Sequence, residues 1–209
     1  METISIMDVE WQDISESSLS ERDTNVLQVF EEEGLTSFTF DGLKRRLGLH
    51  SETLSRVLCR LEDKEIVKKG LDGYKVTPKV RKFLRFPPKS REPRVPILQT
   101  FLSPDVPIHQ VVSDLRGKWF GVLRWLGCSE NDEYITLKWI TEDGETQVDA
   151  NFSNGGLSIE AKLLHGKDLN IALQASYQLI GHIAKLYSRS GQIRRVAHFK
   201  PYVPNSMSA

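Results

Sequence analysis

The stretch over residues 51–64 limits the fold of this chain more than any other, because it carries a strong helical pattern. Its apolar residues recur at the spacing i, i+3, i+4, i+7, which places them on one side of a helix: Leu54, Val57, Leu58 and Leu61. The opposite side carries small hydroxyl groups and two arginines one turn apart, namely Thr53, Ser55, Arg56 and Arg60. Ser51 is expected to cap the start of this helix. We therefore predict a helix that is buried along one side and offers hydrogen-bond donors on the other.

The sequence on either side of this helix predicts a small module. Asp41 is expected to cap a helix over 42–47, and Gly48 to end it. Two β-prone runs, 66–69 and 74–77, flank a Gly/Asp turn and predict a hairpin. The apolar residues of these segments are expected to form one core, namely Leu43, Leu47, Leu49, Leu54, Leu58, Leu61, Ile66, Val67, Tyr74 and Val76.

This ordered series, from residue 38 to residue 77, resembles the winged helix-turn-helix transcriptional regulators of bacteria and archaea. The likeness rests on Leu47-Gly48-Leu49, Thr53-Leu54-Ser55-Arg56, Leu61-Glu62, Ile66-Val67 and Gly73-Tyr74-Lys75-Val76-Thr77. It implies that the helix over 51–64 enters a DNA major groove, where arginine can donate two hydrogen bonds to guanine, and that the hairpin is the wing. The implied contacts to bases and nearby phosphates are Ser51, Thr53, Ser55, Arg56 and Arg60. The implied phosphate contacts are Lys44, Arg45, Arg46, Lys68, Lys69 and Lys75.

The formal net charge of zero conceals a strong asymmetry along the chain. Residues 1–35 contain one basic and ten acidic residues, whereas residues 36–91 contain fifteen basic and six acidic ones. Residues 92–209 contain twelve of each. Phosphate backbones are bound by such local positive fields, so a total of zero does not exclude nucleic acid as a partner. The alternative is that these basic residues lie on a solvated surface and bind no nucleic acid.

Composition shifts divide the chain into four predicted parts. Residues 1–18 form an acidic arm, and residues 19–86 form the winged-helix domain. The latter begins with a helix capped by Ser20, with Asp23 three residues later as the acidic half of a capping box. Residues 87–94 form a basic, proline-rich linker, which either follows a DNA backbone or is a solvated connector. Residues 95–209 form a second domain.

The second domain is predicted to combine an antiparallel sheet with a long helix. A strand over 95–102 and a short helix over 108–115 precede four β-prone runs at 119–127, 133–141, 145–152 and 157–163. Short loops between them predict a meander with one buried and one largely polar face. A helix over 167–188 should cover the buried face, which makes the fold class α+β. Trp119, Trp125 and Trp139 either fill this core, line a ligand cavity or form a homodimer contact.

Enzymatic, metal-binding and membrane classes find no support in the sequence. The five histidines and two cysteines show no metal-ligand spacing, and no cofactor motif is present. No signal peptide or apolar run of membrane-spanning length is found, so a cytoplasmic location is expected. We predict a regulator that binds double-stranded DNA as a homodimer, paired through the long helix or the sheet of the second domain. Two alternatives stay open: a protein–protein interaction module of a transcription or replication assembly, and a regulator whose second domain senses a small-molecule or protein ligand.

Overall fold

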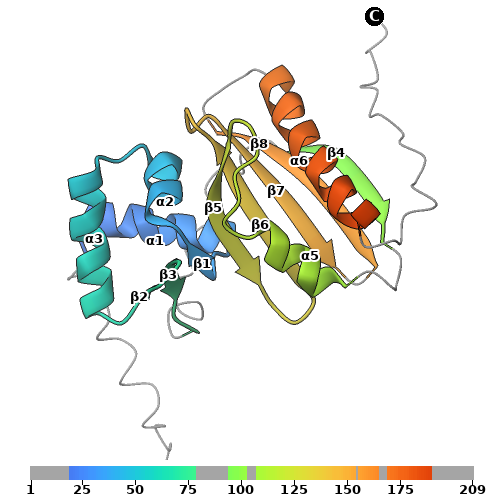
Figure 1. The fold of residues 1–209 in the computed structure, drawn as a ribbon. Helices are drawn as coiled ribbons and strands as arrows, with labels where there is room; N and C mark the ends of the chain where they lie inside the picture. The colour runs from blue at the N-terminus through green and yellow to red at the C-terminus, as the bar shows by residue number, and fades with distance from the viewer. Residues whose placement is uncertain (1–18, 79–93, 103–106, 154, 165–168, 190–209) are drawn as a thin grey trace, which may run out of the picture.

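A computed structural model of the chain describes residues 19–78, 94–102, 107–153, 155–164 and 169–189. The fold is α+β, with helices packed on a single antiparallel sheet (Figure 1). The N-terminal half contains α1 (Glu21–Glu33), β1 (Ser37–Phe38), α2 (Phe40–Leu47), α3 (Ser51–Asp63), β2 (Val67–Gly70) and β3 (Gly73–Val76). The C-terminal half contains β4 (Arg94–Phe101), α5 (Ile108–Leu115), β5 (Leu123–Glu130), β6 (Tyr134–Thr141), β7 (Thr146–Ser153), β8 (Gly156–Leu163) and α6 (Leu169–Arg189). The predicted acidic arm and most of the predicted linker lie outside the described residues.

The helix ends confirm two predictions, the capping box of α1 and Gly48 at the end of α2, and correct two others. Ser20 and Asp23 form the predicted capping box at the start of α1. The cap of α2 is Thr39, whose hydroxyl accepts a hydrogen bond from the Gly42 N–H, so the prediction of Asp41 was wrong because the helix begins two residues earlier than expected. The cap of α3 is His50, whose Nδ1 accepts from the N–H two residues later, so Ser51 is the first helical residue rather than the cap.

The eight strands of the described residues form one sheet in the order β2-β3-β1-β5-β6-β7-β8-β4. The short strand β1 pairs with β3 on one side and with β5 on the other, so the sheet runs from the N-terminal hairpin into the C-terminal strands. Two glycines permit this junction. A Cβ at Gly127 would lie 2.2 Å from the Ser37 carbonyl oxygen, and one at Gly42 would lie 2.6 Å from the Leu126 Cα. The predicted division into two domains stays a prediction, and the sheet crosses that boundary.

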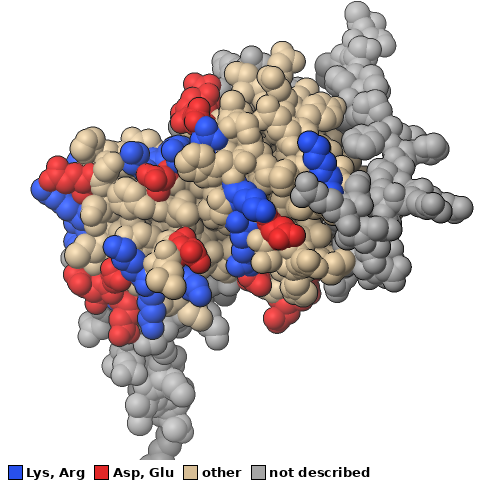
Figure 2. Space-filling view, in the orientation of Figure 1, with Lys and Arg blue, Asp and Glu red and all other residues tan. Residues whose placement is uncertain are grey.

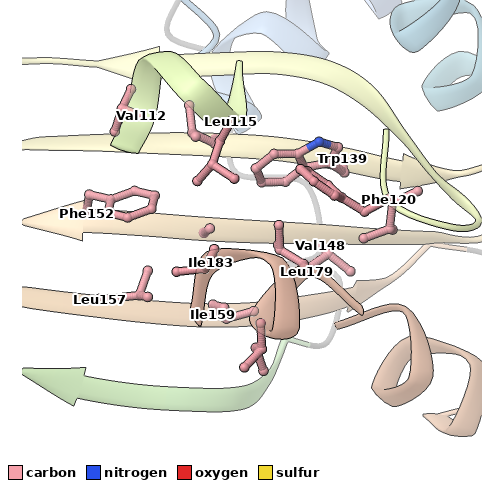
Figure 3. Close-up of a cluster of buried hydrophobic side chains, with 14 of the residues drawn as sticks. Val112, Leu115, Phe120, Trp139, Val148, Phe152, Leu157, Ile159, Leu179 and Ile183 are labelled. Atoms are coloured by element: carbon pink, nitrogen blue, oxygen red, sulfur yellow. The ribbon is translucent and has the colours of Figure 1, made fainter. Parts of the chain in front are cut away.

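Two apolar cores lie along this sheet. The N-terminal core contains all ten predicted residues, with Leu47, Leu49 and Tyr74 partly buried at its margin. The C-terminal core lies between one face of the sheet and the helices α5 and α6, as Figure 3 shows. Within the described residues, no helix has both the length and the apolar character needed to cross a membrane.

Two of the three tryptophans fill the C-terminal core, and the third does not. Trp125 and Trp139 are 8% and 0% exposed and pack edge to face. Trp119 is 63% exposed, and the guanidinium of Arg124 lies 4.6 Å from its ring centroid. The difference arises because Gly121 adopts a positive φ in a turn, so β5 starts four residues later than predicted and Trp119 stays in the preceding loop.

Candidate nucleic-acid interface

The two sides of α3 differ as the sequence predicts. Its apolar stripe is buried, since Leu54, Val57, Leu58 and Leu61 are each at most 1% exposed. Ser55, Arg56, Cys59 and Arg60 are exposed, and Ser51 and Thr53 are half-buried. The helix is therefore held to the rest of the module by its stripe, and its polar side faces outward.

Arg56 is held only weakly. Its Nη2 lies 2.5 Å from Glu52 Oε1 one turn earlier, and both side chains are largely exposed, at 72% and 66%. Exposed pairs of this kind contribute about 0.5 kcal/mol or less. The Arg56 guanidinium can therefore exchange this carboxylate for another acceptor at little cost.

Arg60 is held firmly. Its Nε lies 3.2 Å from both carboxylate oxygens of Asp23, and its Nη2 lies 2.5 Å from one of them. Burial by itself raises the pKa of Asp23, but hydrogen bonds from Arg60 and Ser20 outweigh it and hold that pKa below its ordinary value. Because Asp23 also completes the α1 capping box, Arg60 ties α3 to the start of α1.

A groove of about 220 Å³ lies between α1 and α3. Its lining residues are Arg22, Glu52, Thr53, Arg56, Val57 and Arg60. Arg22 was not predicted as a site residue, because nothing in the sequence shows that the start of α1 lies beside α3. The groove brings together three guanidinium groups and one carboxylate. Arg60 is held by Asp23, so Arg22 and the weakly paired Arg56 are the groups that can turn to an anion such as a phosphate.

The hairpin β2–β3 carries the second group of basic residues. Lys68, Lys69 and Lys75 are all exposed. Lys68 and Lys75 stand directly opposite each other in the ladder. Like charges in that position repel, and an external anion between them would relieve the repulsion. The tip of the hairpin carries Leu71, which is fully exposed.

The basic run on α2 divides into three different environments. The Lys44 ammonium lies 3.2 Å from the Ser51 hydroxyl, and Arg45 is half-buried. Arg46 is buried, with a side chain only 6% exposed that is paired to Glu33 at 3.3 Å. Arg46 is therefore removed from the predicted phosphate contacts, because its charge is turned into the protein. Figure 2 shows both signs of charge side by side over the N-terminal elements.

Glu33, at the end of α1, is the centre of a buried cluster of charges. Its carboxylate lies 3.3 Å from Lys138 Nζ and 2.5 Å from Lys162 Nζ, and Gln147 Nε2 donates to it at 2.8 Å. Asp149 pairs with the same two lysines, at 3.1 and 3.5 Å. The face of the sheet that was predicted to be largely polar is polar in composition, but here it is buried and joined to α1.

Glu33 and Lys138 keep their charges despite their burial. Burial raises the pKa of Glu33, but Lys138, Lys162 and Arg46 outweigh it and bring that pKa well below its ordinary value. Burial lowers the pKa of Lys138, but Asp149 and Glu33 reverse this and raise it above its ordinary value. The ions therefore stabilise one another, and the cluster fixes α1 against β6, β7 and β8.

Other site chemistries find no support in the described part of the chain. No group of three or more His, Cys, Asp or Glu side chains is placed there to hold a metal ion. Cys59 and Cys128 are unbridged. Comparison with protein-family models, with curated proteins and with solved structures found no match to this chain.

Proposed function

We propose that this chain is a sequence-specific DNA-binding regulator whose N-terminal part is a winged helix-turn-helix. In this proposal α3 is the recognition helix and the β2–β3 hairpin is the wing. The order α1-β1-α2-α3-β2-β3 supports this assignment, as do the pairing of β1 with the hairpin and the buried stripe of α3.

The observation that carries the proposal is the pair of anion-seeking surfaces beside α3. One is the groove lined by Arg22 and Arg56, where Arg60 is already held by Asp23, and the other is the hairpin with Lys68 opposite Lys75. Phosphates are bound by such groups, and base edges are read by a neighbouring helix. Over residues 36–78 the excess of positive charge is moderate, with nine basic and six acidic residues, since the remaining six basic residues of the predicted stretch lie at 79–91.

The candidate residues then divide into three roles. Arg56 reads bases, with Ser51, Thr53 and Ser55 at base edges or nearby phosphates. Phosphate contacts come from Arg22, Lys44, Arg45, Lys68, Lys69 and Lys75. Arg60 is a positioning residue, because its donors hold Asp23 and so fix the angle between α3 and α1.

The test is a binding selection from random genomic DNA fragments, followed by gel-shift titration of the enriched site. Arg56→Ala should lower the preference for that site by roughly 5- to 150-fold, the value of one bidentate arginine–guanine pair. Arg116→Ala is the matched control, because Arg116 is also an exposed arginine paired with an exposed glutamate, but it lies away from α3. Equal discrimination by both variants would refute the assignment of Arg56.

The wing is tested by salt dependence. The double variant Lys68→Ala with Lys75→Ala should weaken binding to all sequences equally and reduce the slope of log affinity against log salt by about two. Lys185→Ala, on the exposed side of α6, should leave the slope unchanged. A wild-type affinity that does not vary with salt would exclude phosphate binding.

The alternative function is a winged helix that binds protein. Three acidic residues on the exposed side of α3, Glu52, Glu62 and Asp63, together with Leu71 at the hairpin tip, favour it. If the selection yields no enriched motif, the protein–protein alternative replaces the regulator.

A further inference from the structure

Large exposed apolar side chains are concentrated around α6. Seven such side chains occur among the described residues, and four of them belong to α6 or to the loop before β5: Trp119, Val122, Ile171 and Tyr177. The loop touches the helix, because a Cβ added at Gly121 would lie 1.7 Å from Gln178 Oε1. A concentration of this kind on a water-soluble surface marks an interaction site.

The solvent side of α6 also carries little charge, and none of it is negative. Residues 169–189 include no acidic residue, and their only basic residues are Lys185 and Arg189. The exposed positions are Asn170, Ile171, Gln174, Tyr177, Gln178, Gly181, Ala184 and Lys185. A surface helix of a monomer ordinarily carries charges opposite its buried stripe. Apart from Lys185, the opposite side is filled by amides, small residues and apolar side chains. In Figure 2 the described surface over α6 is mostly tan, with a basic residue on it.

The inner side of α6 is already occupied. Leu179 and Ile183 point into the core beneath the helix (Figure 3), and Ala172 and Ala175 are 0% exposed. The solvent side is therefore not a core surface that the same chain covers in the described structure.

We infer that this surface binds a second copy of the chain, with α6 packed antiparallel against α6 of the partner subunit. A strongly charged partner would lose its hydration here and find only Lys185 among the described charged side chains of α6, so the complementary surface should itself be mostly uncharged. Elsewhere this chain is rich in charged residues, at 27% overall, and the α6 surface is its own best complement. Such a self-complementary contact is the isologous kind that a two-fold axis produces.

The shape of the surface fixes the register. Tyr177 projects, with 54% of its area exposed, and Gly181 one turn later is a hollow, with no atom within 4 Å of an added Cβ. A two-fold axis on the exposed side of α6, level with residue 179 along the helix, places Tyr177 of each chain in the hollow at Gly181 of the partner subunit. The contact is independent of DNA, and it would supply the two binding modules that a palindromic site requires.

The test is the molar mass of the full chain without DNA, measured by size-exclusion chromatography with light scattering from 1 to 100 µM. The wild type should elute as a dimer of twice 23.8 kDa. Tyr177→Glu and Gly181→Lys should each give a monomer with an unchanged circular dichroism melting curve. Leu71→Glu, which places the same charge on the hairpin tip, is the control and should stay dimeric.

The double variant distinguishes this register from any other. Tyr177→Glu combined with Gly181→Lys places opposite charges against each other twice across the axis and should restore the dimer. A wild type that is monomeric at 100 µM overturns the inference, and so does a dimer that neither single variant weakens. Failure of the double variant to restore the dimer overturns the antiparallel register. Because no DNA is present, none of these outcomes depends on the proposed function.

Discussion

The strands β6, β7 and β8 present two buried faces of opposite chemistry. One face contributes Trp139, Val148 and Ile159 to an apolar core under α5 and α6. The other contributes Lys138, Asp149 and Lys162 to the ionic cluster that receives Glu33. Burial is similar, since these six side chains are between 0% and 6% exposed. The comparison therefore separates the effect of chemistry from the effect of burial.

The two faces hold their helices in different ways. Apolar contact is non-directional, so α6 can shift slightly and keep most of its stabilisation. An ion cluster tolerates little displacement, because a buried charge without its partner costs several kcal/mol. We expect the polar face to specify where α1 docks and the apolar face to supply most of the stability.

The largest effect is expected from Glu33→Gln, which keeps the shape of the side chain and removes its charge. Lys138 and Lys162 would then have too little negative charge beside them, and the free energy of unfolding should fall by about 3–5 kcal/mol. Urea denaturation measures this. Glu32→Gln, an exposed neighbour, is the control and should change stability by no more than about 0.5 kcal/mol. A similar loss of stability in both variants would mean that the buried ion cluster around Glu33 contributes no more than an exposed glutamate does.

The second prediction concerns pH. Because the folded pKa of Glu33 is lowered, its stabilisation is fully present above the ordinary value of 4.5 and is lost as the pH falls below it. The raised pKa of Lys138 gives stabilisation that is fully present below 10.5 and is lost as the pH rises above it. The stability difference between wild type and Glu33→Gln should therefore shrink below about pH 4.5, as measured by urea titrations from pH 3 to pH 7. A difference that stays constant down to pH 3 would contradict this.

A smaller effect is expected on the apolar face. Ile159→Val removes one methyl group from a fully buried position and should cost about 0.5–1.5 kcal/mol. Unlike the Glu33 effect, this cost should be the same at pH 3 and pH 7, because no titrating group is involved. A loss of stability above about 3 kcal/mol would show that the apolar face tolerates a small change in a side chain no better than the polar face does.

The smallest effect is expected from an ion pair in solvent. Glu52→Gln removes the partner of Arg56, and because both side chains are largely exposed, stability should change by no more than about 0.5 kcal/mol. Thermal unfolding followed by circular dichroism measures this. A loss comparable to that of Glu33→Gln would mean that burial does not set the strength of ion pairs in this chain.

Local patterns were enough to predict most elements of this fold. These patterns depend on residues only a few positions apart in sequence. They are the apolar stripe of α3, the capping box of α1 and the tight connections between the later strands. The start of β5 was misplaced because Trp119 and the residues after it are β-prone, whereas the conformation of Gly121 decides the boundary.

Long-range chemistry could not be predicted in the same way. Strand alternation indicates that Lys138 and Lys162 share a face, but it cannot tell whether water or another helix covers that face. Three consecutive glutamates end α1, and the last of them, Glu33, is fixed against the sheet by ions that lie 105 and 129 residues away in sequence. The same limit applies to two arginines. Arg46 was predicted to contact phosphate but is buried against Glu33, whereas Arg22 was not predicted as a site residue but lies beside α3. Both outcomes depend on how the helices pack.

The two-residue strand β1 has a practical consequence for anyone who divides this chain. A fragment that ends at Pro78 would leave one edge of β1 without its hydrogen-bonded neighbour, and a fragment that begins at Arg94 would expose the matching edge of β5. Open edges of this kind recruit other chains and promote aggregation. The two halves should therefore be insoluble when expressed separately. When co-expressed they should become soluble, because the two fragments can pair again through β1 and β5.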